Sequence, residues 1–146
     1  MGEEGMIGRS CAMLLVASTT LAGCGLDWRR EHPLGCRLDE QPLVRDTLYF
    51  GASIPDGGEV DAAAWRKFED DTLAPAFPDG YTVTAANGTW RNKNGESIHE
   101  ATRVFTVVHA DTAEWAATLR RVAAGYRDRF HQQSVLHEYS VVCAGF

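Results

Sequence analysis

Histidine, arginine and aromatic side chains on the predicted strands are the residues that could do chemistry in this 146-residue chain. An imidazole can accept or donate a proton, an arginine can pair with an anion, and an aromatic ring can pack against a ligand. No motif supplies a catalytic partner, because Ser-x-x-Lys, Gly-x-Ser-x-Gly, a phosphate-binding glycine loop and Cys-x-x-Cys are all missing from the sequence. We therefore assign no catalytic residue and expect no cofactor.

Alternation along the predicted strands selects the candidates for binding. A four-stranded sheet with helices on one face leaves its other face open, and alternate residues of a strand share a face. Leu48 and Phe50 in the first strand, 104, 106 and 108 in the third, and Leu136 in the last suit the helix side. The candidate ligand or interface residues predicted for the open face are then Arg45, Tyr49, Arg103, Phe105, His109, His137 and Tyr139.

Three uses of this open face compete, because a large apolar patch is seldom left bare. The first, which we adopt as the prediction, is a homodimer interface or a docking surface for another protein. The second is a small-ligand site in which Arg103 or Arg45 pairs with an anion while Tyr49 or Phe105 packs on the ligand. The third is an enzyme that uses His109 or His137 as acid or base. His99, His109 and His137 are not spaced like a local metal-binding motif, so we predict no metal.

A predicted hairpin carries the remaining candidates. Trp90 is interpreted as a core aromatic in preference to a binding residue. Arg91 and Glu100 are expected to form a cross-strand ion pair, which contributes under about 1 kcal/mol if exposed.

Cys24 has a different chemistry. It follows an apolar segment, Cys11 to Leu21, that is preceded by Arg9 and is too short to span a bilayer. The string Leu21-Ala22-Gly23-Cys24 is similar to the lipobox of bacterial lipoproteins, which implies that residues 1–23 are a signal peptide and that Cys24 is lipidated. The alternatives are a signal peptide of a soluble protein or a chance apolar run. Acidic Glu3 and Glu4 oppose export, so we expect translation to start at Met6.

Lipidation sets the expected location and partners. Two or three acyl chains would hold the protein on a membrane in the cell envelope. Gly25, rather than an aspartate, follows the cysteine, so the lipoprotein rule implies the periplasmic face of the outer membrane in a cell with two membranes. The chain has a formal net charge of −6, which argues against a nucleic-acid partner. The expected partners are the membrane and either a second copy or another envelope protein.

Two further cysteines, Cys36 and Cys143, remain in the mature chain. In an oxidising compartment we expect them to form a disulfide, with two free thiols as the alternative.

The pattern of elements predicts an α+β fold. After a tether over residues 24–43, strand and helix signals alternate in the order β-α-β-β-α-β, which is the order of the ferredoxin-like fold: four antiparallel strands with two helices on one face. Asp61 is the predicted cap of the first helix, which Pro75 and Pro78 should end, and Asp111 is the predicted start of the second. The expected domain covers residues 44–146. Its strands are placed at 45–53, 81–90, 98–110 and 134–143.

An ordered series of short segments also resembles a known family. The segments are Tyr49-Phe50-Gly51, Val60-Asp61, Pro75 to Gly80, Gly88 to Arg91, and Gln133 to Leu136. They are similar to a family of small bacterial lipoproteins known as domain of unknown function 3574, over residues 45–146. The resemblance implies a fold and a compartment and brings no activity. This chain has His131 where the resemblance leads us to expect glycine.

Overall fold

The computed structural model describes residues 35–55 and 57–146. The predicted signal peptide, the lipidated Cys24 and the tether up to residue 34 lie outside the described residues. Four strands and two helical segments make up the fold. They are β1 (Gln41–Gly51), α1 (Ala62–Phe68), η2 (Glu69–Leu73), α2 (Ala74–Ala76), β2 (Thr82–Arg91), β3 (Ser97–His109), α3 (Ala113–Phe130) and β4 (Leu136–Ala144).

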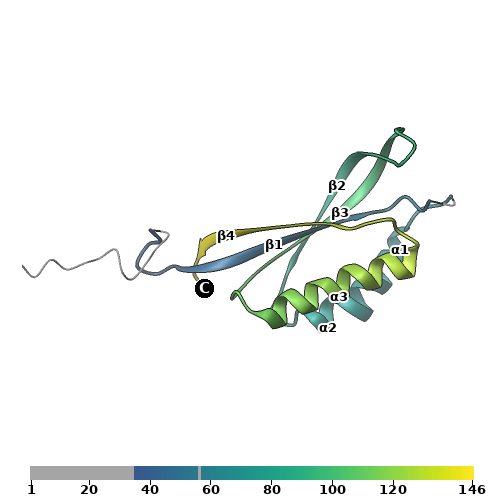
Figure 1. The fold of residues 1–146 in the computed structure, drawn as a ribbon. Helices are drawn as coiled ribbons and strands as arrows, with labels where there is room; N and C mark the ends of the chain where they lie inside the picture. Colours follow the sequence, from purple (N-terminus) through teal and green to yellow (C-terminus); the bar gives the residue numbers. More distant parts are fainter. Residues whose placement is uncertain (1–34, 56) are drawn as a thin grey trace, which may run out of the picture.

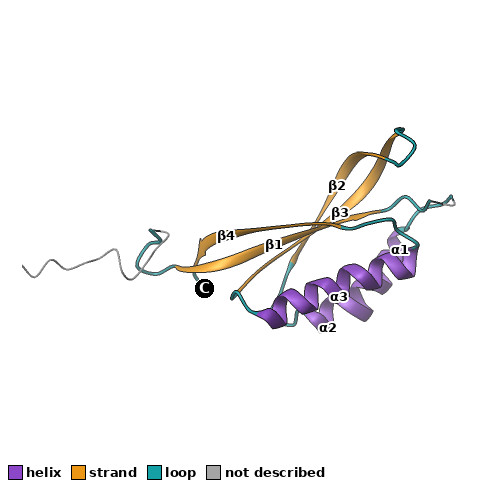
Figure 2. Ribbon diagram, viewed as in Figure 1, coloured by secondary structure: helices purple, strands orange, loops and turns teal. Residues whose placement is uncertain are grey.

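The strands form one antiparallel sheet with the order β2-β3-β1-β4. The helices lie together on one side of this sheet, with α3 beside the α1–α2 segment (Figure 1). Within the described residues no helix lies on the other side of the sheet, and the β2–β3 hairpin extends away from the helical layer (Figure 2). Element order, strand order and layering confirm the predicted ferredoxin-like α+β fold.

The first strand begins earlier than predicted, and part of the expected tether belongs to the sheet. Gln41, Pro42 and Leu43 pair with Ala144, Cys143 and Val142 of β4. On the other side of β1, pairing with β3 begins only at Val44, opposite His109. Pro42 is tolerated because β1 has a neighbour on one side only at that point, so its missing N–H interrupts no second ladder.

The first helical segment begins as predicted and ends slightly later. Asp61 is the N-cap, and its Oδ1 accepts hydrogen bonds from the backbone N–H groups of Ala63 (3.0 Å) and Ala64 (2.8 Å). A π-helical turn, η2, then precedes Pro75, which lies in the first turn of α2, so the chain stays helical to Ala76. The residue Pro75 lacks only an N–H that a helix start leaves unpaired.

The second helix, α3, is capped by Thr112, and not by the predicted Asp111. The Thr112 hydroxyl accepts a hydrogen bond from the backbone N–H of Trp115 at 3.3 Å. The helix ends at Phe130, and His131 adopts a left-handed conformation with φ of 52°, at the position where the family resemblance suggested glycine. Its buried stripe, Leu119, Val122, Tyr126 and Phe130, faces the sheet.

An aromatic core fills the space between the helices and the sheet. Phe50 of β1 lies at its centre, with ring centroids 4.7 Å from Tyr126, 5.5 Å from Trp65 and 5.8 Å from Phe68. The Tyr126 hydroxyl donates a hydrogen bond to the carbonyl oxygen of Gly51 at 2.9 Å. Burial raises the pKa of Tyr126 well above its usual value, because the ionised phenolate would lie in an apolar environment.

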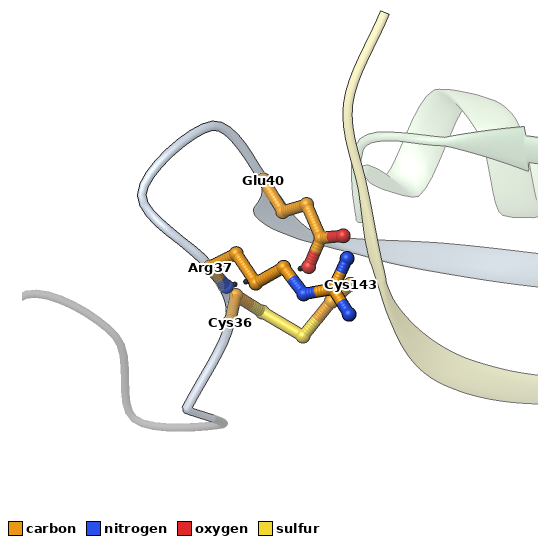
Figure 3. Close-up of a disulfide and its surroundings, with 4 residues drawn as sticks. All are labelled: Cys36, Arg37, Glu40 and Cys143. Atoms are coloured by element: carbon orange, nitrogen blue, oxygen red, sulfur yellow. Dashed lines mark hydrogen bonds between the residues drawn. A yellow bond between two sulfur atoms is a disulfide. The ribbon is translucent and has the colours of Figure 1, made fainter.

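A disulfide joins the entry of the domain to its last strand. Cys36 and Cys143 are bonded, with their Cα atoms 5.4 Å apart, as the two remaining cysteines predicted. The pair lies where the chain turns into β1, a turn also held by the backbone N–H of Arg37 donating to the carboxylate of Glu40 (Figure 3). Closing a loop of this length stabilises the fold by about 4–5 kcal/mol in the chain-entropy model.

Candidate functional site: the open sheet face and a hollow at its end

Strand register decides which residues lie on the open face. Leu48 pairs with Phe105 across β1 and β3, and directly paired residues point to the same side of a sheet. Leu48 is fully buried beneath the helices, so Phe105 is too, with 0% of its surface exposed. The ring of Phe105 lies 4.7 Å from that of Phe77 and 5.3 Å from that of Tyr81. The predicted open-face position of Phe105 is therefore wrong.

Arg103 and His109 also lie on the face opposite to the one predicted. Both alternate with Val104 and share the helix side with Phe105, where Arg103 is half-buried and His109 is buried. The His109 ring stacks on the indole of Trp115, with centroids 4.3 Å apart and planes 10° apart. The sequence of β3 does not indicate which residues face the helices, because valines occupy both of its faces. The larger Phe105 is the side chain that fills the space under the helices.

In β4 the predicted faces are also exchanged. His137 pairs with Leu48 and Tyr139 pairs with Asp46, which puts both on the helix side. Leu136 was expected to point inward, yet it pairs with Tyr49 on the open face and is 62% exposed. As an edge strand, β4 is poorly covered on both faces, so Tyr139 remains 73% exposed, and its sequence shows no clear apolar alternation.

The open face itself has an uncharged centre with charges along one side. Thr47 of β1 and three residues of β3 (Val104, Thr106 and Val108) form the centre, on which the side chains are short. Arg45 lies on this face, beside Ser140 of β4. Tyr49, also on this face, donates a hydrogen bond from its hydroxyl to Glu138 at 2.9 Å, and this bond raises the pKa of the phenol. Of the seven predicted site residues, the structure brings only Arg45 and Tyr49 to this surface.

Asp46 was missed in the sequence, and it is the residue that links the two candidate histidines. Its Oδ2 lies 2.7 Å from Nε2 of His109, and its Oδ1 bonds to Nε2 of His137. The other ring nitrogen of His109 lies 2.7 Å from the carbonyl oxygen of Ala110. Both ring nitrogens of His109 are therefore within hydrogen-bond distance of an oxygen atom.

The contacts of this cluster are those of a structural network. Asp46 is 4% exposed and His109 is 7% exposed, so little of either side chain is open to solvent. Neither ring nitrogen of His109 is free, whereas an acid or base must reach the group whose proton it moves. His109 is therefore not positioned as a catalytic acid or base. His137, whose side chain is 35% exposed, lies on the edge strand β4 and forms the outer side of the cluster.

A hollow of about 290 Å³ lies at one end of the open face. Its floor is formed where two strands carry glycine in place of a side chain, Gly51 in β1 and Gly88 in β2. A Cβ atom at Gly51 would overlap the carboxylate of Glu100, and one at Gly88 would lie 2.7 Å from the hydroxyl of Thr102. The hollow thus exists only because both positions are glycine.

Aromatic side chains and one carboxylate line this hollow. Tyr49 and Trp90 contribute ring surface, and Trp90 is 36% exposed, so it is not the core residue that the sequence suggested. Glu100 is half-buried, and its Oε2 accepts a hydrogen bond from the backbone N–H of Ser53 at 2.9 Å. The loop before β4, residues 132–134, completes the rim.

The expected ion pair between Arg91 and Glu100 does not form. Register places Glu100 opposite Gly88, while the Arg91 guanidinium donates to the carbonyl oxygen of Gly95 at 2.6 Å. The hairpin loop spans residues 92–96 with a single positive φ, at Gly95, and this five-residue length sets the register. Glycines within strand patterns at 51 and 88 were the sequence signal that could have marked the hollow.

Among residues 35–55 and 57–146, no group of three or more His, Cys, Asp or Glu side chains could hold a metal ion. In the same part of the chain, no helix has the length and hydropathy needed to cross a membrane.

Fold and site together define a small ferredoxin-like domain with an uncovered sheet face. The chain belongs to a family described as "Protein of unknown function (DUF3574)", whose sequence model matches residues 45–146. No curated protein matches the chain.

Solved structures similar to this fold include a phage SAM lyase in two states. The structure in complex with S-methyl-5'-thioadenosine has a TM-score of 0.55 and 12% sequence identity, covering 71% of this chain and 90% of the lyase chain. The apo structure has a TM-score of 0.54 and 13% identity, with coverage of 72% and 90%. At this identity the likeness shows a shared fold alone.

Proposed function

We propose that this protein is a non-catalytic, lipid-anchored lipoprotein of the bacterial cell envelope whose folded domain binds a second copy of itself through the open sheet face. The observation that carries the proposal is the uncharged centre of that face. Val104, Thr106 and Val108 are half-buried and lie beside Thr47, which is 7% exposed, and no helix of the described chain lies on this side of the sheet (Figure 2). A neutral surface of this kind favours association, because its burial removes apolar area from water and leaves no charged group buried without a partner.

The pattern of charges around this centre supports a second copy as the partner. Arg45 and Glu138 lie on the same face, on neighbouring strands. A twofold axis through the centre presents this face to itself, so that the arginine of one copy can approach the carboxylate of the other. A partner with a uniformly charged surface would instead leave one of these two residues opposite a like charge.

Two features support the envelope location. The apolar segment and the string Leu21-Ala22-Gly23-Cys24 are those of a lipoprotein signal, with Cys24 as the lipidated residue. The bonded pair of Cys36 and Cys143 fits an oxidising compartment outside the cytoplasm. With Gly25 after the lipidated cysteine, we propose the periplasmic face of the outer membrane in a cell that has two membranes.

Binding of a small ligand is the second candidate, and the hollow beside Trp90 favours it. The similar phage lyase was solved with S-methyl-5'-thioadenosine, which is an example of this fold holding a small molecule. An anionic ligand is not supported in this hollow, because Arg103 lies on the helix side, Arg45 does not line the hollow, and the charged group that does is Glu100.

Light scattering coupled to size-exclusion chromatography tests the pairing. The chain from Gly25 onward, which keeps every described strand and helix, should have the mass of a dimer. Thr106→Arg places a charge at the centre of the face and should give a monomer with an unchanged thermal transition, since Thr106 is only half-buried. Thr89→Arg is the matched control, because Thr89 is exposed on the opposite side of the projecting hairpin. A wild-type chain that remains monomeric at about 100 μM would overturn the proposal.

A further inference from the structure

We propose that the hollow between Trp90 and Glu100 binds a small organic cation, with its ammonium group against the Glu100 carboxylate and its apolar body on the rings of Trp90 and Tyr49. The site lies at the end of the open face and uses residues other than those at the centre of the proposed dimer contact. The inference therefore does not depend on pairing.

The surroundings of the Glu100 carboxylate indicate that the ligand is positively charged. This carboxylate is half-buried, one of its oxygens bonds to the backbone N–H of Ser53, and no ion pair between described residues includes it. Arg91 of the hairpin donates to the carbonyl oxygen of Gly95, and Arg103 points to the helix side of β3. A cation in the hollow would supply the opposite charge that this partly desolvated carboxylate lacks.

The aromatic side chains select an organic cation over a hydrated metal ion. Tryptophan and tyrosine ring faces attract ammonium groups that carry alkyl substituents, while hard metal ions require several oxygen ligands. Among the residues that the structure describes, Glu100 is the only carboxylate that lines the hollow. The net charge of the chain, −6, also attracts cations to its surface.

The size of the hollow limits the ligand to a small one. Its volume, about 290 Å³, is at the lower end of the range for small-molecule sites. Gly51 and Gly88 leave room for the Glu100 carboxylate and the Thr102 hydroxyl to lie over the strands, so that the carboxylate sits on the floor of the hollow, within reach of a ligand. The exposed faces of Trp90 and Leu136 stand at its border, where an apolar ligand body would cover them.

Binding of choline measured by isothermal calorimetry tests this inference. The chain from Gly25 onward should bind choline saturably, and its uncharged analogue 3,3-dimethylbutanol should bind about tenfold more weakly or not at all. Equal affinity for the two probes would overturn the assignment of a cation site, and so would the absence of saturable choline binding up to about 10 mM.

Variants then locate the site. Glu100→Gln keeps the size and the acceptor for the Ser53 N–H, and should weaken choline binding about tenfold through loss of the charge. Trp90→Leu should weaken it similarly. Glu96→Gln is the control, because Glu96 lies in the hairpin loop outside the hollow and its loss changes the net charge equally. Unchanged affinity in Glu100→Gln, or an equal loss in Glu96→Gln, would show that the hollow is not the site.

Discussion

Nε2 of His109 lies 2.7 Å from Oδ2 of Asp46, and both side chains are buried between the sheet and α3. This pair ties β3 to β1, and His137 extends it to β4. Three of the four strands are therefore joined through one carboxylate, at the end of the sheet where β1 emerges from the disulfide-bonded turn.

Removing this carboxylate should destabilise the domain strongly. In Asp46→Ala, His109 and His137 both lose the carboxylate that bonds their Nε2 atoms, and the buried ring of His109 is left without that partner, so the free energy of unfolding should fall by about 2–3 kcal/mol. Urea denaturation followed by circular dichroism measures the change. His99→Ala is the control, since His99 is exposed on the hairpin, and it should lower stability by less than about 0.5 kcal/mol. Similar small losses in both variants would contradict a structural role for Asp46.

Glycine at position 131 should stabilise the protein. His131 has a φ of 52°, and a side chain with a Cβ atom costs about 1–2 kcal/mol in this left-handed conformation. His131→Gly removes that cost and should raise the free energy of unfolding by about 0.5–1 kcal/mol, after the larger unfolded-state entropy of glycine is subtracted. His131→Ala separates the two effects, because it retains a Cβ atom and should bring no gain. Equal stabilisation by both variants would show that the backbone conformation is not the cause.

Alkaline pH should reduce stability through Tyr126. Burial raises the pKa of this phenol in the folded state, whereas in the unfolded chain it ionises near pH 10. The folded state therefore keeps a proton that the unfolded chain loses, so its stabilising contribution is present below about pH 10 and falls by up to about 1.4 kcal/mol per pH unit above it.

Tyr126→Phe isolates this effect. The variant should be less stable than wild type by about 1 kcal/mol at pH 7, because the hydrogen bond to the Gly51 carbonyl is lost. This difference should shrink and then reverse above about pH 10. Subtracting the two pH profiles also cancels Tyr49 and Tyr81, whose raised pKa values act in the same direction in both proteins. A difference that stays constant between pH 7 and pH 11 would contradict the assignment.

Lipid attachment should depend on one sulfur atom. In cells given a fatty acid that carries a detectable tag, the wild-type chain should become labelled and sediment with membranes. Cys24→Ala should lose both properties, because its side chain has no thiol to acylate. Cys11→Ala is a useful comparison, since Cys11 lies in the proposed signal peptide and its loss should leave labelling unchanged. An unlabelled wild-type protein would exclude the anchor.

Local signals in the sequence predicted the elements well, because each is read from a few adjacent residues. Asp61 caps α1 as expected, and the helical stripe from Leu119 to Phe130 is buried as expected. The error at the start of α3, where Thr112 replaces Asp111, arises because both residues are good caps and only the backbone path distinguishes them. Pro42 likewise suggested a loop, because the sequence does not reveal that β3 stops before reaching it.

The site was harder to predict, because it depends on how distant strands align. A one-residue change of register exchanges the two faces of a strand. In β3, valines at 104, 107 and 108 fit either face, so the sequence alone gave no preference, and the wrong alternative moved Phe105 and His109 to the open side. Glu100 and Trp90 reach the same hollow from two strands only through the register fixed by the hairpin.

The bond between Cys36 and Cys143 also governs what a protease can do to this domain. Almost every described residue lies between the two cysteines, which are separated by 107 positions. A single cut at any peptide bond between residues 36 and 143, for example in the exposed hairpin loop at residues 92–96, leaves two fragments that stay covalently attached. The nicked chain stays one covalently linked molecule until the disulfide is reduced, so a single cut would not by itself release either half.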